Sequence, residues 1–305
     1  MDSYILGQQL VNGLTLGSIY GLIAIGYTMV YGIIGMINFA HGDVYMISAY
    51  ISAIALAVVS YFGVQSIPFA LLFTLIITMI ITGMYGWSIE RTVYRPLRST
   101  NRLAPLISAI GVSLVLQNYV QIAQGPNVQG VPTLIDGSFR VGTPEHFVQI
   151  KYMSLMIIVI SILAMGILTW LIHGTSLGRQ FRATQQDRKM ATILGINTTR
   201  IISMVFVIGS VMAAIAGVLV TLNYGSFDFF IGFIVGIKAF SAAVLGGIGS
   251  LPGAMLGGLL LGILESLFSG YVSSDYKDVF SFSVLVLVLI FKPSGLLGRP
   301  AVEKV

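Results

Sequence analysis

The stretch GRQFRATQQDRKMATILGINTTR (residues 178–200) lies between two long apolar runs and holds five of the sixteen basic residues of the chain. This concentration of charge is unusual, because only 9% of the 305 residues are charged and 56% are hydrophobic. Soluble domains contain about 25% charged residues. The composition therefore predicts a polytopic membrane protein, in which such a segment is a loop between two spans.

Apolar runs on both sides of this loop predict an all-α polytopic membrane protein with about eight to nine transmembrane helices, since a span needs about 20 apolar residues. Near 36–45 and 246–253, polar residues or glycine and proline predict broken or re-entrant segments. We interpret 1–305 as a single transmembrane domain, and we expect its first span to be kept rather than cleaved as a signal peptide. The predicted spans are 9–37, 39–62, 67–89, 104–124, 152–172, 201–222, 232–249, 254–271 and 279–292.

Basic residues are concentrated in three segments, 90–102, 178–200 and the tail from 292, which hold twelve of the sixteen, including Arg102, Arg299 and Lys304. The positive-inside rule places such segments in the cytoplasm. We therefore expect cytoplasmic loops at about 90–103 and 173–200 and a periplasmic loop at about 125–150. The N-terminus is then outside if three spans precede residue 90, or inside if the segment near 36–45 does not cross. The net charge of +5 needs no nucleic acid to explain it.

The chain lacks the residues that several kinds of chemistry need. The chain has no cysteine, and its three histidines are dispersed without metal-ligand spacing. Neither the nucleophile-elbow pattern G-x-S-x-G nor a P-loop is present. We therefore expect no cofactor, no metal and no catalytic site, and ATP-driven transport would require a separate ATPase chain.

The charged loop itself contains the signals of a short helix. Thr184 and Asp187 have the spacing of an N-terminal capping box, and Gly195 is suited to the C-terminal end. The ten residues QQDRKMATIL between them form too short a helix to be stable alone in water. This helix therefore packs either against the lipid headgroups or, by helix-in-groove docking, into a groove on a cytosolic partner. The apolar face consists of Met190, Ile193 and Leu194, and the basic residues elsewhere on the helix are Arg188 and Lys189.

Polar groups inside the apolar runs are candidates for the translocation path, because such groups are costly at membrane depth. Asn38, His41 and Asp43 interrupt the run near 36–45, although a polar turn at the membrane interface would also explain them. Glu265 lies deep in the span 254–271 and has no basic partner within that helix. We interpret Lys238 as a lysine that extends to the headgroups.

Glycine makes up 35 residues and recurs at four-residue spacing, as in Gly13, Gly17 and Gly21, and in Gly258 and Gly262. This spacing allows membrane helices to approach closely. We therefore expect a tightly packed bundle.

With these residues laid out, the chain resembles the integral membrane permease of high-affinity branched-chain amino-acid ABC importers. The resemblance implies a bacterial inner-membrane subunit that pairs with a second, related permease, two cytosolic ATPase subunits and a periplasmic amino-acid-binding protein. It implies further that the helix at 184–195 couples the ATPases to alternating access of the spans. The matching stretches are IGYTMVYGIIGMINFAHGD, YGWSIERTVYRPLR, LISAIGVSLVLQN, LGINTTRI, KAFSAAVLGGIGSLPGAMLGG and FKPSGLLGRPAVEKV.

Two positions depart from the family pattern. The family commonly has A-H-G-E where this chain has Asp43, and the coupling loop is often E-A-A-x-x-x-G, whose glutamate is missing before Gly195. Similar permeases transport urea, short amides or other amino acids, and residue spacing does not separate these substrates. An ion-coupled carrier or channel is a further alternative, since the polar residues of the apolar runs could bind ions.

Overall fold

The structure is a computed structural model that describes residues 3–98, 100–101, 103–132, 134–143 and 146–298. Arg102, Arg299 and Lys304, three of the basic residues used to predict the topology, lie outside the described residues. In the first half of the chain the elements are α1 (Ser3–Ile34), α2 (His41–Tyr61), α3 (Ile67–Ile89), the π-helix η1 (Glu90–Tyr94), α4 (Arg95–Leu97), α5 (Leu103–Gln124), β1 (Gln129–Gly130), β2 (Ser138–Gly142) and β3 (Phe147–Lys151). In the second half they are α6 (Tyr152–Gly174), α7 (Ser176–Gln186), α8 (Arg188–Ile193), α9 (Thr198–Tyr224), β4 (Ser226–Phe227), α10 (Ile231–Gly246), α11 (Leu251–Tyr271) and α12 (Lys277–Phe291).

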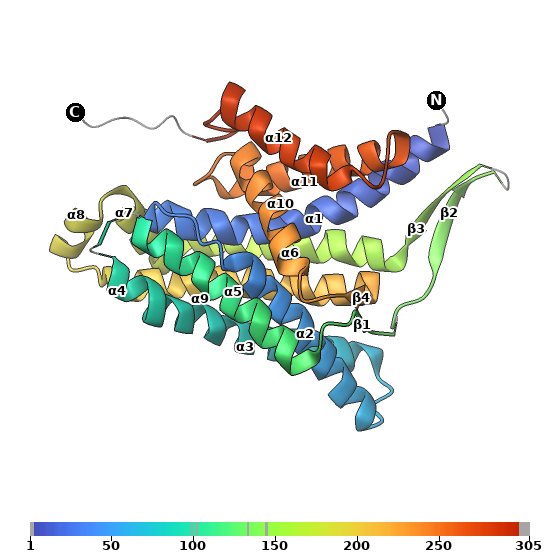
Figure 1. Cartoon of the computed structure of the whole chain (residues 1–305), viewed down its shortest axis with the longest axis horizontal. Helices are drawn as coiled ribbons and strands as arrows, with labels where there is room; N and C mark the ends of the chain where they lie inside the picture. Colours follow the sequence, from blue (N-terminus) through green and yellow to red (C-terminus); the bar gives the residue numbers. More distant parts are fainter. Residues whose placement is uncertain (1–2, 99, 102, 133, 144–145, 299–305) are drawn as a thin grey trace.

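Long helices form a bundle that confirms the predicted all-α membrane fold (Figure 1). Among the described residues, seven helices are long and apolar enough to cross a membrane. The predicted spans 232–249 and 279–292 correspond to the shorter helices α10 and α12, of 16 and 15 residues. Two small antiparallel sheets, β1–β4 and the hairpin β2–β3, occupy segments that were expected to be loops.

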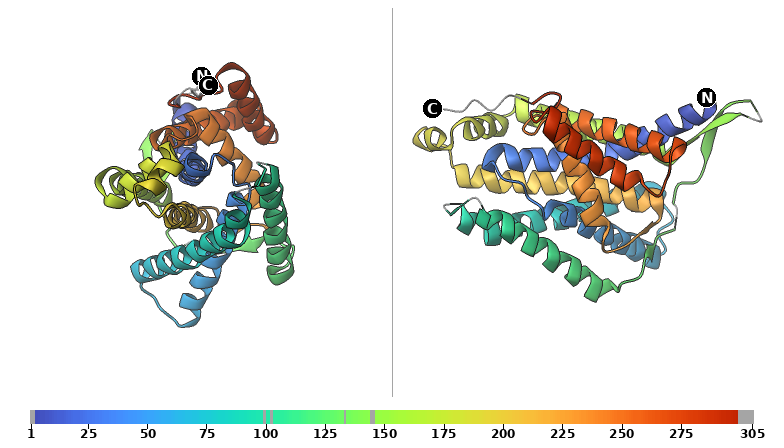
Figure 2. Two further views of the ribbon diagram at one scale, coloured as in Figure 1. Left: turned by 90° about the vertical axis from the view of Figure 1, so that its left-hand side faces the viewer. Right: turned by 45° about the horizontal axis from the view of Figure 1, so that its top comes forward.

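Helices α1 and α9 lie at the centre of the bundle and have few residues that face outward (Figure 2). In α9 most side chains from Ile201 to Leu222 are buried. By contrast, α3, α5 and α6 bury only a minority of their residues and leave rows of large apolar side chains exposed. A helix that is apolar all round is typical of a buried span, and the exposed apolar faces of α3, α5 and α6 are suited to contact with lipid.

Glycine contacts hold α1 against α11, as the four-residue spacing predicted. A methyl group built on Gly17 would lie 2.7 Å from the Cα atom of Leu259, and one on Gly13 would lie 2.6 Å from the Cα atom of Ile263. On the facing helix, Gly258 abuts the backbone of Gly21. The two backbones therefore approach at distances that no larger residue permits.

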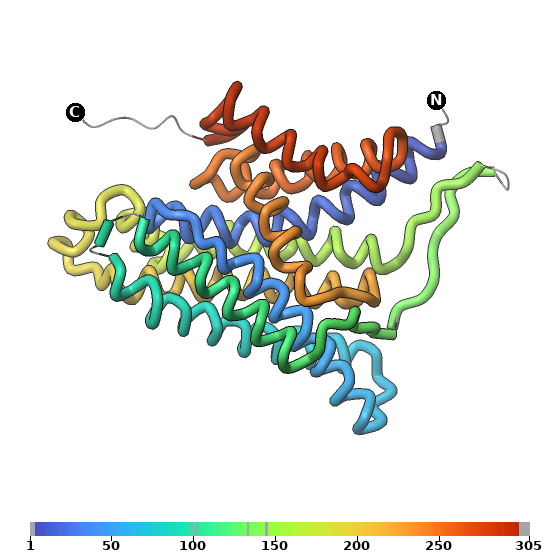
Figure 3. The backbone as a smooth tube through the Cα atoms, in the orientation of Figure 1, coloured from blue at the N-terminus to red at the C-terminus, as the bar shows by residue number. Residues whose placement is uncertain are grey.

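Both predicted helix interruptions are present, at 35–40 and at 247–250. Gly35 follows α1 with φ +71°, and Gly247 and Gly249 join α10 to α11 with φ +104° and +96°. Such positive φ values are readily adopted only by glycine. After α1 the chain turns back, so that α2 starts partway along the bundle (Figure 3). Helix α2 begins at His41, slightly after the predicted start at 39, and α11 begins at Leu251, slightly before the predicted start at 254.

The bundle has two chemically distinct ends. One, which we call the basic end, carries α4, α7 and α8 (left in Figure 1). The other, the hairpin end, carries β2–β3 and the first turns of α1, where Gln8 and Gln149 exchange two hydrogen bonds of 3.1 and 2.8 Å.

Candidate functional site

Helix α8 projects from the basic end with its apolar face uncovered. Asp187 begins the helix, and its Oδ1 accepts a hydrogen bond of 3.0 Å from the backbone amide of Met190. Gly195 ends it with φ +84°, as predicted. Met190, Ile193 and Leu194 are 56%, 77% and 75% exposed. Apolar side chains grouped in this way at the tip of a short helix form a surface suited to docking.

The predicted capping box is wrong in its first member and in the length of the helix. Thr184 lies inside α7, is buried, and donates its hydroxyl to the carbonyl of Gln180 at 2.7 Å. The extended backbone of Asp187, with φ −153° and ψ 107°, separates α7 from α8 and leaves α8 only six residues. The cause is that an aspartate cap requires non-helical backbone at its own position, so that the helix cannot run through Asp187.

Helix α7 attaches this projecting segment to the bundle. Phe181 is buried, and the guanidinium of Arg182 donates to the carbonyl of Ile172 at the end of α6. A methyl group at Gly32, near the end of α1, would lie 2.8 Å from the side-chain nitrogen of Gln185. One on Gly249, in the turn between α10 and α11, would lie 3.9 Å from the same nitrogen. Gln185 of α7 therefore lies close to both interrupted regions of the bundle.

A buried carboxylate lies beside α8 that sequence reasoning missed. Glu90 is fully buried and pairs with Arg95, at 3.0 Å, and with Arg98. Ser203 of α9 donates to the same carboxylate at 2.6 Å. The spacing of five residues from Glu90 to Arg95 matches one turn of the π-helix η1, whose closing backbone bond joins the same two residues. A search limited to α-helical spacings of three and four overlooks this pair.

Electrostatics connect this cluster to α8. Burial lowers the pKa of the Arg98 guanidinium, and the positive charges of Arg188 and Arg95 act in the same direction, while Glu90 opposes them. Arg188 is the first residue of α8. The charge on α8 is therefore close enough to affect the Glu90 cluster.

Asn38, His41 and Asp43 are buried, as expected for residues that face protein rather than lipid. Asn38 accepts a hydrogen bond of 3.0 Å from the hydroxyl of Tyr94, and Asp43 accepts one of 3.0 Å from Gln117. The ring of His41 packs edge-on against that of Tyr27, with 4.9 Å between the ring centroids. These contacts fix the start of α2 against its neighbours.

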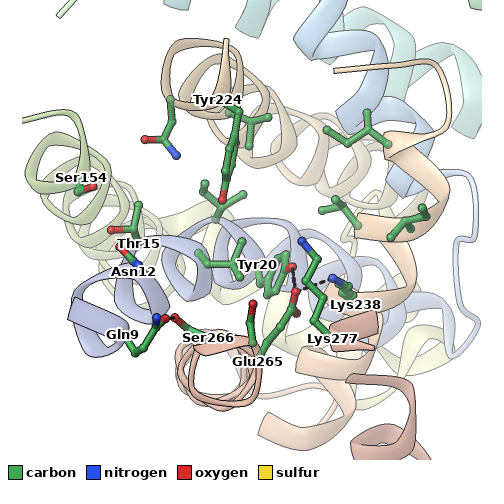
Figure 4. A pocket seen from close by; sticks show the side chains of 18 of the residues that line it. Gln9, Asn12, Thr15, Tyr20, Ser154, Tyr224, Lys238, Glu265, Ser266 and Lys277 are labelled. Atoms are coloured by element: carbon green, nitrogen blue, oxygen red, sulfur yellow. Dashed lines mark hydrogen bonds and ion pairs between the residues drawn. The ribbon is translucent and has the colours of Figure 1, made fainter. Parts of the chain in front are cut away.

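A cavity of about 620 Å³ opens among α1, α9, α10, α11 and α12, towards the hairpin end (Figure 4). Glu265 lines it, but Asn38, His41 and Asp43 do not, so the structure does not bring the four candidates for the translocation path together. The volume lies within the range of about 300–1,000 Å³ that is usual for small-molecule sites.

Lys238 and Glu265 form a buried ion pair in the wall of this cavity, with 2.6 Å between Nζ and Oε1. The interpretation of Lys238 as a lysine that extends to the headgroups is therefore wrong, because the side chain is only 4% exposed. Nor is Glu265 without a partner: its Oε2 also accepts hydrogen bonds from Tyr20, at 3.1 Å, and from Ser281, at 2.9 Å. Both charges occur singly in separate apolar helices, and that is the sequence signal from which the pair could have been predicted.

Residues 9–289 match the family described as the branched-chain amino acid transport system / permease component, and the chain belongs to this family. It is 54% identical to the high-affinity branched-chain amino acid transport system permease protein BraD of Pseudomonas aeruginosa, over 98% of this chain and 97% of that protein. The permease protein LivH of Escherichia coli K12 is similar to the same extent and over the same shares. The permease protein LivM of Salmonella typhimurium is 27% identical over 96% of this chain and 71% of its own length. The resemblance inferred from the sequence motifs is thus confirmed.

Proposed function

We propose that this chain is the transmembrane permease subunit of an ATP-driven importer of branched-chain amino acids in the bacterial inner membrane. The observation that carries the proposal is the 54% identity, over nearly the whole of both chains, to permeases of high-affinity branched-chain amino acid transport systems. The chain itself makes and breaks no covalent bond in this role. Its task is to expose a path alternately to the two sides of the membrane.

The proposed partners follow from the same relatives and from the surface of the bundle. A second, related permease is supported by the similarity to LivM, which belongs to a system with the same substrate class. One of the two cytosolic ATPase subunits would dock on the exposed apolar face of α8 and the other on the second permease, and a periplasmic amino-acid-binding protein would deliver the substrate at the hairpin end. Membrane lipid would cover the apolar surfaces of α3, α5 and α6.

Coupling would run through residues 184–195 in this arrangement. Closure of the ATPases would move α8 and, through Asp187, the end of α7 with Gln185, and the turns at 35–40 and 247–250 would change their positions. The Glu90 cluster joins η1 to the second turn of α9, which follows α8 in the chain. The basic end is therefore assigned to the cytoplasm, in agreement with the positive-inside rule.

Reconstitution tests the proposal. The chain, its partner permease and the ATPases are placed in vesicles, and uptake of labelled leucine is measured with ATP inside or outside and with the binding protein added. We expect uptake that needs ATP on the side of the basic end and that isoleucine and valine inhibit, but urea and short amides do not. Uptake by the chain without ATPases would instead indicate an ion-coupled carrier or channel, and preferential uptake of urea would reject the substrate class.

Orientation has an independent test, because the natural chain contains no cysteine and single-cysteine variants carry no background. Lys189→Cys in intact cells should react with a membrane-impermeant maleimide only after the cells are opened. Labelling of this variant in intact cells would overturn the assignment of α8 to the cytoplasm and, with it, the coupling role.

A further inference from the structure

The cavity at the hairpin end contains charges of both signs in a chain that has few charges at all. Three lysines and two carboxylates line it, namely Lys151, Lys238, Lys277, Glu265 and Asp278. Two of them, Lys238 and Glu265, are almost completely buried. Isolated charges at such a depth are costly. Charges of both signs in one wall therefore indicate a function beyond holding the helices together.

The charged groups in this wall differ in how many partners they already have. Glu265 accepts from Lys238, Tyr20 and Ser281, so both its oxygens are occupied. Asp278 shares the ammonium of Lys238 with Glu265: its Oδ1 is buried and lies 2.5 Å from Nζ, while the side chain as a whole is 39% exposed. Two carboxylates thus face one ammonium, which leaves one negative charge in excess.

Lys277 supplies the opposite charge beside Asp278. Its ammonium forms no ion pair within the described part of the chain, and its side chain extends into the cavity on the same side as Lys238 (Figure 4). An excess negative charge at Asp278 and the ammonium of Lys277, which has no ion pair among the described residues, thus lie on neighbouring residues at the start of α12. Together they match a ligand that carries one positive and one negative group a few atoms apart.

Apolar side chains form the adjoining wall. Leu16 comes from α1, and Ile234 and Val235 come from α10, one turn before Lys238. A ligand with a charged head at α12 would therefore place an aliphatic side chain against these residues. A neutral amide or urea would use neither the excess negative charge at Asp278 nor the ammonium of Lys277.

We propose that this cavity binds an amino-acid zwitterion, with its α-ammonium at Asp278, its α-carboxylate at Lys277, and its aliphatic side chain against Leu16, Ile234 and Val235. The proposal rests on the proposed function and deepens it, because it puts a substrate-selecting site within the permease itself. The Lys238–Glu265 pair is a positioning element, since the ammonium of Lys238 holds Asp278 at the cavity. It also keeps Glu265 unavailable to the ligand.

A ligand series tests the site without any substitution. The purified chain in lipid nanodiscs is titrated with L-leucine, leucinamide, N-acetyl-leucine and urea, and binding is followed by saturation-transfer NMR, which detects weak ligands. Leucine should bind saturably, whereas leucinamide and N-acetyl-leucine, each lacking one charge, should bind at least tenfold more weakly. Urea should give no saturable signal. Equal affinity for leucine and leucinamide, or no saturable signal with leucine, would overturn the proposal.

Asp278→Asn is the matching variant, because it keeps the size of the side chain and leaves the Lys238–Glu265 pair in place. This substitution should weaken the binding of leucine at least tenfold and reduce the preference for leucine over N-acetyl-leucine. Asp275→Asn is the control: it makes the same change of charge three residues away, outside the cavity lining. Equal affinities of the two variants would overturn the site.

Vesicle uptake separates this proposal from the function on which it rests. If the assembled importer transports leucine and Asp278→Asn binds leucine as the unmodified chain does, the site is wrong and the proposed function stands. If the assembled importer transports urea in preference to leucine, the proposed function itself is wrong.

Discussion

Replacing Ile193 and Leu194 together by alanine should weaken docking of the ATPase subunits without affecting the fold. The two side chains are 77% and 75% exposed, so their truncation removes little packing from the bundle. Full burial of such a side chain contributes about 1.5–3 kcal/mol. Since alanine retains one methyl group, we expect a loss of about 1–1.5 kcal/mol at each position when the surface is covered.

The combined loss of about 2–3 kcal/mol corresponds to a Kd that is weaker by about 30- to 150-fold. The assay is a titration of purified ATPase onto nanodiscs that hold the permease pair, with and without the two substitutions. Ile162→Ala with Leu163→Ala is the matched control, because these residues form an exposed isoleucine–leucine pair on α6. An unchanged Kd, or an equal loss in the control, would refute docking on α8 and favour contact of this helix with lipid headgroups.

Three further changes test the packing and the caps. Gly17→Leu should abolish folded protein in detergent size-exclusion profiles, because the side chain would enter the α11 backbone, whereas Gly111→Ala, with open space around it, should be tolerated. Glu90→Gln should destabilise the chain by about 3–5 kcal/mol, seen as a lower melting temperature, because it removes the negative charge from a buried ion cluster. Asp187→Ala should cost α8 about 1 kcal/mol and speed hydrogen exchange of its amides, while Thr184→Ala should leave that exchange unchanged.

Features that depend on composition and local spacing could be predicted from the sequence. The apolar runs predicted the helical bundle, and the glycine spacing predicted the close helix contact that α1 makes with α11. The interruption near 246–253 was visible because glycine and proline act on the backbone next to them, and the one near 36–45 was visible because polar residues break the apolar run. The end of α8 at Gly195 belongs to the same class.

Features that depend on contacts between distant helices could not be predicted in the same way. Lys238 and Glu265 are 27 residues apart, and only the packing of α10 against α11 brings their charges together. Glu90 was missed for a local reason, since η1 changes the spacing at which side chains meet. Thr184 was misplaced because its neighbour Asp187 is the stronger cap for the shorter helix.

The contact of α1 with α11 also restricts how the molecule can move. Helices α1 and α11 meet backbone to backbone at their glycines, and side-chain hydrogen bonds from Ser266 to Gln9 and from Tyr20 to Glu265 also join them, so we expect the two helices to move as one unit. Bending would then be confined to the ends of this pair, where Gly35 and Gly247 have the positive φ values that only glycines adopt among the described residues. In a transport cycle α1 and α11 would tilt together, and the surrounding helices would shift around them.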